Sequence, residues 1–150
     1  MHLRGDVSDL AFRKCAVVAL QPMKSILIAE GDPNVAKLFT NVFRQFGWRV
    51  ASPFDANGTL KALRSAEHFD IMLISSKVRG SDGIELIKAA RSLEHRKHLR
   101  VLMVTGTGGM EIEAFAAGAD EVLHKPIGID MLVAAADKHL VGVGQQAKKA

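Results

Sequence analysis

Polar side chains that suit an ion-binding site follow four of the short apolar runs in this sequence. Glu30 and Asp32 come after the first run, Ser75 ends another, and Thr105 and Lys125 follow the last two. Carboxylates are common ligands of Mg²⁺, whereas hydroxyl and ammonium groups donate hydrogen bonds to phosphoryl oxygens. Chemistry on a phosphate or another small anion is therefore open to these residues, provided that the fold brings them together.

From residue 25 onward, short apolar runs alternate with amphipathic stretches, which predicts alternating strands and helices. The predicted strands are residues 26–29, 48–51, 70–75, 100–104 and 121–124. The predicted helices are residues 33–46, 55–66, 82–95, 109–117 and 129–140. Asp32 is the expected cap of the first helix, because Pro33 follows it in a position that favours helix initiation.

Apolar residues spaced three and four apart predict which helix faces are buried. In the first helix they are Val35, Leu38, Phe39, Val42, Phe43 and Phe46. In the last helix they are Met131 or Leu132, Ala135, Ala136 and Leu140. The basic cluster over residues 95–100 is expected to be a solvated helix end, far from Ser75.

Five strands that alternate with five helices predict an α/β fold with a parallel sheet covered on both faces. Right-handed crossovers leave few topologies, and for this length we expect a flavodoxin-like three-layer sandwich with strand order 2-1-3-4-5. In such a fold, functional groups gather at the carboxyl ends of the strands. The polar residues after the apolar runs should therefore share one pocket.

Composition indicates one globular domain. The chain has 150 residues, of which 48% are hydrophobic and 24% charged, and it has a single cysteine, Cys15. No apolar run approaches the ~20 residues that span a bilayer, and one cysteine favours a reducing compartment. We therefore expect a cytoplasmic protein that does not associate with membranes.

The net charge of +4 comes from the two ends of the chain, because residues 25–140 hold 14 basic and 14 acidic residues. We predict a flexible or loosely docked extension over residues 1–24, the domain over residues 25–140 and a flexible tail over residues 141–150. These flanks are too short for an output domain. Basic tails are weak support for nucleic-acid binding, and solvated chain ends are the favoured interpretation of this charge.

The order and spacing of the polar motifs over about residues 25–140 resemble the receiver domain of bacterial response regulators, a CheY-like fold. This resemblance implies that Ser75 stands where an aspartate takes phosphate from a histidine kinase. It further implies that Glu30 matches the first of two metal-binding acids, and that Thr105 and Lys125 match the groups that bind phosphoryl oxygens. Pro126 matches a proline that usually follows a cis peptide bond.

The chain departs from the family pattern at three positions. Ser75 replaces the phosphoacceptor, Gly31 replaces the second acidic residue, and Val122 replaces an aromatic switch residue. A serine hydroxyl cannot form an acyl phosphate, and two missing carboxylates weaken metal binding. We therefore predict a degenerate pseudo-receiver that has no catalytic residues and in which Mg²⁺ binding is weak or absent.

Each retained polar group has two roles open to it. Lys125 pairs with Glu30 or forms an anion site. Thr105 satisfies loop backbone groups or binds phosphoryl oxygens, and Asp32 caps a helix or serves as a substitute metal ligand. Ser75 has Thr105 and Lys125 as possible hydrogen-bond partners.

The function that this resemblance implies is two-component (phosphorelay) signalling by protein binding, without turnover. The partner would be a histidine kinase or a downstream signalling protein, and a homodimer is also open. In the family, the usual surface is formed by the fourth helix, the fifth strand and the fifth helix. The candidate residues on that surface are Ile112, Phe115, Val122, His124, Ile129 and Val133.

Two other functions stay open from the sequence. The first is residual phosphoryl or anion-binding activity at the degenerate pocket, through Lys125, Thr105 and Glu30. The second is nucleic-acid binding through the basic tails.

Overall fold

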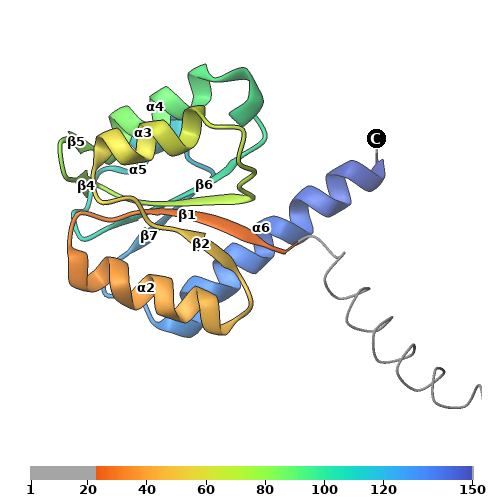
Figure 1. Ribbon diagram of the computed structural model, residues 1–150, viewed down its shortest axis with the longest axis horizontal. Helices are drawn as coiled ribbons and strands as arrows, with labels where there is room; N and C mark the ends of the chain where they lie inside the picture. The colour runs from red at the N-terminus through yellow and green to blue at the C-terminus, as the bar shows by residue number, and fades with distance from the viewer. Residues whose placement is uncertain (1–22, 150) are drawn as a thin grey trace, which may run out of the picture.

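The computed structural model describes residues 23–149 of the chain (Figure 1). Our expectations for residues 1–22 lie outside the described residues. Lys24, which we assigned to the N-terminal extension, contacts the domain: its Nζ lies 3.3 Å from Asp137 Oδ1 and 5.4 Å from the centre of the Trp48 ring.

A five-stranded parallel sheet forms the centre of the molecule. Its strands are β1 (Ser25–Ala29), β2 (Arg49–Ala51), β3 (Ile71–Ser75), β6 (Arg100–Thr105) and β7 (Glu121–His124). Their order is β2-β1-β3-β6-β7, and every neighbouring pair is parallel. The predicted flavodoxin-like topology is confirmed.

Helices cover both faces of the sheet (Figure 1). Helices α2 (Pro33–Gln45) and α6 (Ile129–Lys149) lie on one face, and α3 (Ala56–Arg64), α4 (Gly83–Ser92) and α5 (Glu111–Ala117) lie on the other. Among the described residues, no helix is both long and apolar enough to cross a membrane.

The central strands are apolar between their polar ends because the sheet is buried on both faces. Every residue of β1 and β3 is buried. Successive side chains enter opposite cores: Leu27 and Met72 pack toward α3 and α4, whereas Ile26 and Leu73 pack toward α2 and α6. Burial on both faces therefore fixes the positions of the strands in the sheet. The polar residues that follow these strands consequently lie together at its carboxyl edge.

A small two-stranded sheet, which the sequence did not predict, follows β3. Strands β4 (Lys77–Val78) and β5 (Ser81–Asp82) pair antiparallel and return the chain to α4. Asp82 caps α4 by accepting a hydrogen bond from the Glu85 backbone N–H at 2.8 Å. A Cβ at Gly83 would lie 2.2 Å from the Ser75 carbonyl oxygen, so only glycine allows α4 to begin this close to the end of β3.

Several predicted helix faces and boundaries are wrong. Leu38 and Phe46 are 48% and 52% exposed, because they lie beside and beyond the part of α2 that covers the sheet. On α6, where burial of either Met131 or Leu132 was predicted, Leu132 is the buried one and Met131 is exposed, so that prediction is confirmed. The predicted helix over 82–95 ends at Ser92 and is followed by a 3₁₀ turn, Glu94–Arg96, whereas α6 extends past residue 140 to Lys149.

Arg96 is buried, whereas we predicted a solvated helix end for its segment. Its guanidinium donates hydrogen bonds to the carbonyl oxygens of Ala62, Leu63 and Ser65 at 3.1, 2.8 and 3.0 Å. These carbonyls lie at the end of α3, and the carbonyl oxygens in the last turn of a helix have no N–H partner within the helix. Burial lowers the pKa of the Arg96 guanidinium from its ordinary value, while the charge of Glu67 opposes that shift.

Candidate functional site

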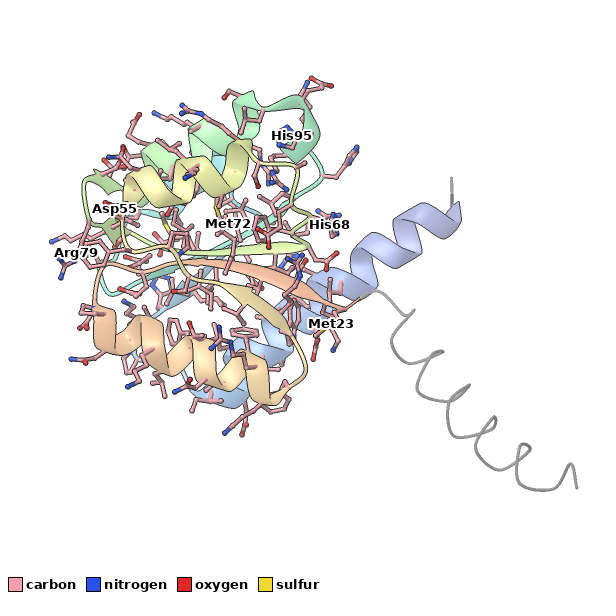
Figure 2. The ribbon with its side chains drawn as sticks, viewed as in Figure 1. Met23, Asp55, His68, Met72, Arg79 and His95 are labelled. Carbon is pink, nitrogen blue, oxygen red and sulfur yellow. The ribbon has the colours of Figure 1, made fainter. Side chains whose placement is uncertain are left out.

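The carboxyl ends of β1, β3 and β6 surround one pocket, together with the loop that follows β7. The pocket has a volume of about 470 Å³. It lies at the opposite end of the sheet from His68 and His95 (Figure 2). The residues that line it are Glu30, Gly31, Asp32, Ser75, Ser76, Lys77, Val78, Arg79, Gly106, Thr107 and Lys125.

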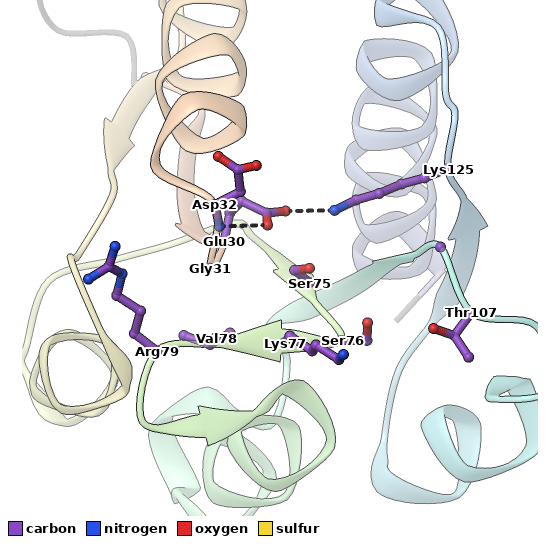
Figure 3. A pocket seen from close by; sticks show the side chains of 11 residues that line it. Glu30, Gly31, Asp32, Ser75, Ser76, Lys77, Val78, Arg79, Thr107 and Lys125 are labelled. Atoms are coloured by element: carbon purple, nitrogen blue, oxygen red, sulfur yellow. Dashed lines mark hydrogen bonds and ion pairs between the residues drawn. The ribbon is translucent and has the colours of Figure 1, made fainter.

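Glu30 and Lys125 form an ion pair across this pocket (Figure 3). Lys125 Nζ lies 3.1 Å from Glu30 Oε2, and the Glu30 side chain is only 5% exposed. The other Glu30 oxygen, Oε1, accepts a hydrogen bond from the Asp32 backbone N–H at 3.1 Å. Both carboxylate oxygens are therefore engaged within the protein, as the first of the two alternatives for Lys125 predicted.

Gly31 is held close to the chain that follows β3. Its N–H donates a hydrogen bond to the Lys77 carbonyl oxygen at 3.1 Å. A Cβ built at Gly31 would lie 2.6 Å from the same oxygen, well inside van der Waals contact. The backbone of Lys77 thus fills the space that a side chain at position 31 would need.

Ser75 ends β3 and lies on the floor of the pocket between Asp32 and Ser76 (Figure 3). The residue is 5% exposed. Within residues 23–149, its hydroxyl forms no hydrogen bond with Thr105 or Lys125, so neither predicted partner is found. Its Oγ is a small neutral group at the place where the family resemblance requires a carboxylate.

Thr105 holds the loop that lines one side of the pocket. It is fully buried, and its Oγ1 accepts a hydrogen bond from the Thr107 backbone N–H at 3.0 Å. Thr107, and not Thr105, is the threonine that lines the pocket. The loop role predicted for Thr105 is confirmed, and sequence reasoning did not identify Thr107.

The other predicted pocket residues have mixed positions. Asp32 lines the pocket and also caps α2, since its Oδ1 accepts a hydrogen bond from the Asn34 backbone N–H at 2.9 Å. The Lys125–Pro126 peptide bond is cis, as the resemblance implied. Pro126 itself is exposed and stands outside the lining. Lys77 and Arg79, which sequence reasoning did not single out, enter the lining through the β4–β5 hairpin.

The residues present do not fit a magnesium site of the receiver type. Mg²⁺ usually recruits one or two carboxylates with near-octahedral geometry. Here the Glu30 carboxylate is bound by Lys125 and by a backbone N–H, Gly31 offers no side chain, and Ser75 offers only a hydroxyl. Asp32 is the one lining carboxylate with an exposed position, and its Oδ1 already caps a helix.

The predicted partner surface is exposed at some positions and buried at others. Ile112, Phe115 and Ile129 are 86%, 51% and 42% exposed. Val133 is 5% exposed and belongs to the core, because it faces the sheet from α6; its assignment to the surface is wrong.

Three further residues complete the description of that surface. Val122 is half-buried, and Nε2 of the exposed His124 lies 2.8 Å from Glu111 Oε1. Met131, 67% exposed, is an apolar residue of α6 that the prediction omitted from the surface.

Comparison with known proteins identifies the family. The profile described as "Response regulator receiver domain" matches residues 26–137. The chain belongs to the response regulator receiver family. As a receiver domain it is a component of two-component signalling, in which receivers interact with protein partners such as kinases.

Two curated relatives show the range of proteins to which this receiver is similar. The chemotaxis protein CheY of Pseudomonas aeruginosa is 30% identical over 109 residues, which are 71% of this chain and 88% of CheY. Sporulation initiation phosphotransferase F of Bacillus subtilis is 30% identical over 121 residues, which are 78% of this chain and 94% of that protein.

Solved structures give the same fold. A putative response regulator from Chloroflexus aurantiacus superimposes with a TM-score of 0.74 at 28% identity, covering 80% of this chain and 99% of the other. A CheY-like receiver domain protein from Methanospirillum hungatei gives a TM-score of 0.73 at 25% identity, covering 86% and 100%. The strand order found here is therefore that of the CheY fold.

Proposed function

We propose that this receiver is a degenerate pseudo-receiver that signals by binding a protein partner in the cytoplasm, without aspartyl phosphorylation and without turnover. The observation that carries the proposal is the contact between Gly31 and Lys77. The Lys77 carbonyl oxygen accepts the Gly31 N–H and occupies the space where a second metal-binding side chain would stand.

Two further features of the pocket support the same conclusion. Ser75 Oγ is a hydroxyl, which is neutral near pH 7 and cannot form the acyl phosphate of the family. Lys125 is neutralised by Glu30 at 3.1 Å, so its ammonium is already paired before any phosphoryl group arrives. Without a bound metal ion, the charge of an incoming phosphodonor would meet a pocket in which Lys125, the cation that matches the family's phosphoryl-binding lysine, is already paired with Glu30.

The proposed partner surface is the exposed apolar part of α5 together with the start of α6. Ile112, Phe115, Ile129 and Met131 all expose at least two fifths of their surface. Exposed apolar side chains grouped on one face favour protein association. The proposed partner is a histidine kinase or a downstream signalling protein, and a second copy of the chain would use the same face.

Phosphorylation is tested by incubating the protein with Mg²⁺ and a radiolabelled small phosphodonor. The proposal expects no stable label on the protein, whereas a receiver that retains the aspartate, treated in parallel, is labelled. A stable label on Ser75 would contradict the proposal. That result would instead support residual phosphotransfer at Ser75, Lys125 and Thr105.

Partner binding is tested with matched phenylalanine variants. Phe115 and Phe46 are similarly exposed, at 51% and 52%, but lie on α5 and just after α2. Wild-type protein and Phe46→Asp should retain the same protein from cell lysate, and Phe115→Asp should lose it. Equal retention by both variants would remove α5 from the proposed interface.

Nucleic-acid binding through the basic tails is the weaker alternative, since Lys24 pairs with Asp137. A salt titration of DNA affinity tests it, because several phosphate contacts produce a steep loss of affinity with salt.

A further inference from the structure

A second groove, separate in most of its lining from the Ser75 pocket, lies between α2 and the loop that joins β2 to α3. Its volume is about 390 Å³, within the usual range of small-molecule sites. Lys37, Asn41 and Arg44 line one wall, and their spacing along α2 places them on one side of the helix. Phe54 and Arg79 line the other side.

The groove is strongly basic. In the part of the chain that the structure describes, Lys37, Arg44 and Arg79 form no ion pair with an acidic residue. Glu30 is the one acidic residue in the lining, and Lys125 balances its charge from the neighbouring pocket at 3.1 Å. Three unpaired cations around one concavity favour a ligand with several negative charges.

An aromatic platform stands at the edge of the same groove. The Phe54 side chain is 70% exposed, although phenylalanine is usually buried. The Arg79 guanidinium carbon lies 4.6 Å from the centre of the Phe54 ring. Figure 2 places Arg79 beside Asp55 at the carboxyl-end side of the sheet. Aromatic rings and arginine planes both stack with nucleobases.

We propose that this groove binds a nucleotide, with its phosphates on Lys37, Arg44 and Arg79 and its base against Phe54. A concave site of this volume is better suited to a small ligand than to the flat surface of a protein partner. A segment of Asp and Glu residues would satisfy the three cations, but it has no planar group to stack on the exposed ring of Phe54. The polar Thr40, Asn41 and Ser52, which also line the groove, offer hydrogen bonds to a sugar or a base.

The test is calorimetric titration of the full chain at low salt with ATP, GTP, tripolyphosphate and a glutamate-rich peptide, each without Mg²⁺. We expect at least one nucleotide to bind with a dissociation constant below about 1 mM and at least tenfold more tightly than tripolyphosphate. Arg44→Ala should weaken nucleotide binding about tenfold or more, since it removes a charge-assisted hydrogen bond. Phe54→Leu should weaken the binding of the nucleotide but leave that of tripolyphosphate unchanged.

Two matched variants locate the ligand. Lys61 is an exposed cation on α3, outside the groove, and Lys61→Ala should leave nucleotide affinity unchanged. Lys77 lines the Ser75 pocket but not this groove, so Lys77→Ala should also have no effect. All these side chains are exposed, and circular dichroism of each variant should show an unchanged melting temperature.

Four results would overturn the proposal. They are equal affinity for tripolyphosphate and nucleotide, binding of the acidic peptide without the nucleotide, an effect of Lys77→Ala equal to that of Arg44→Ala, and no binding of any probe. None of them would bear on the phosphorylation test at Ser75. The failure of one proposal is therefore distinguishable from the failure of the other.

Discussion

Replacing Gly31 by alanine should destabilise this protein far more than the addition of one methyl group normally does. The new Cβ would lie 2.6 Å from the Lys77 carbonyl oxygen, so the backbone at 77 has to move. Overpacking of this kind costs about 1–3 kcal/mol. The shift also stretches the hydrogen bond between Gly31 N–H and Lys77 O, which is 3.1 Å long and contributes about 1 kcal/mol.

The sum is a loss of about 2–4 kcal/mol in the free energy of unfolding. For a chain of this length, each kcal/mol lowers the melting temperature by about 2–4 °C. Thermal unfolding followed by circular dichroism should therefore show a drop of about 5–15 °C for Gly31→Ala.

Gly108→Ala is the matched control for this prediction. Among residues 23–149, no heavy atom beyond Gly108 and its two chain neighbours lies within 4 Å of a Cβ built at Gly108, in the loop after β6. Its melting temperature should change by no more than about 2 °C, as for most surface substitutions. If Gly31→Ala is as stable as Gly108→Ala, the Lys77 carbonyl does not exclude a side chain at position 31. A second metal-binding carboxylate could then be accommodated there, contrary to the proposed function.

Three further substitutions test other parts of the structure. Ser75→Asp alone should not give efficient Mg²⁺-dependent labelling by a phosphodonor, because Gly31 still supplies no second carboxylate. Adding Gly31→Asp should raise labelling and lower the melting temperature. Normal labelling of the single variant Ser75→Asp would contradict this account. Arg96→Leu should cost about 3 kcal/mol in chemical denaturation, since three hydrogen bonds to the end of α3 are lost, and an unchanged denaturation midpoint would show that those bonds contribute nothing net. Lys125→Met should cost about 1–2 kcal/mol in the same assay, because it leaves a buried carboxylate without its cation, whereas a gain in stability would show that removal of the charge outweighs the pairing.

The fold could be predicted because each local signal agreed with the others. The apolar run over residues 70–75 is too short for a helix and is buried on both faces, which only a strand between two helical layers allows. Asp32, Asp55 and Asp82 each precede a helix, and each caps that helix with its side chain. Each of these signals involves only a few consecutive residues, so it can be recognised in the sequence without knowledge of the fold.

The candidate site could be predicted in its side chains but not in its backbone. The pairing of Lys125 with Glu30 followed from their positions after two strands whose carboxyl ends lie at the same edge of the sheet. The contact between Gly31 and Lys77 did not, because it joins two main-chain groups across 46 positions of the sequence. No pattern of residue types records the path of the β4–β5 hairpin.

The remaining failures have a common cause. Arg96 and Val133 were assigned to the surface from residue type or from family position, whereas burial depends on which element packs over each residue. Arg96 is covered because the end of α3 lies against it, and Val133 because α6 turns that side toward the sheet. Leu38 was assigned to the core from spacing alone, but it lies outside the buried face of α2, which is formed by Phe39, Thr40, Val42 and Phe43.

The Gly31–Lys77 contact gives its two members unequal tolerance to mutation. The bond uses only main-chain atoms, and the Lys77 side chain is exposed. Natural variation can therefore exchange the residue at 77 for almost any other without disturbing the junction, except for those that alter the hairpin itself. At position 31, by contrast, a single-nucleotide change that adds any side chain acts directly on the backbone of another segment. Purifying selection would therefore act more strongly on Gly31 than on Lys77.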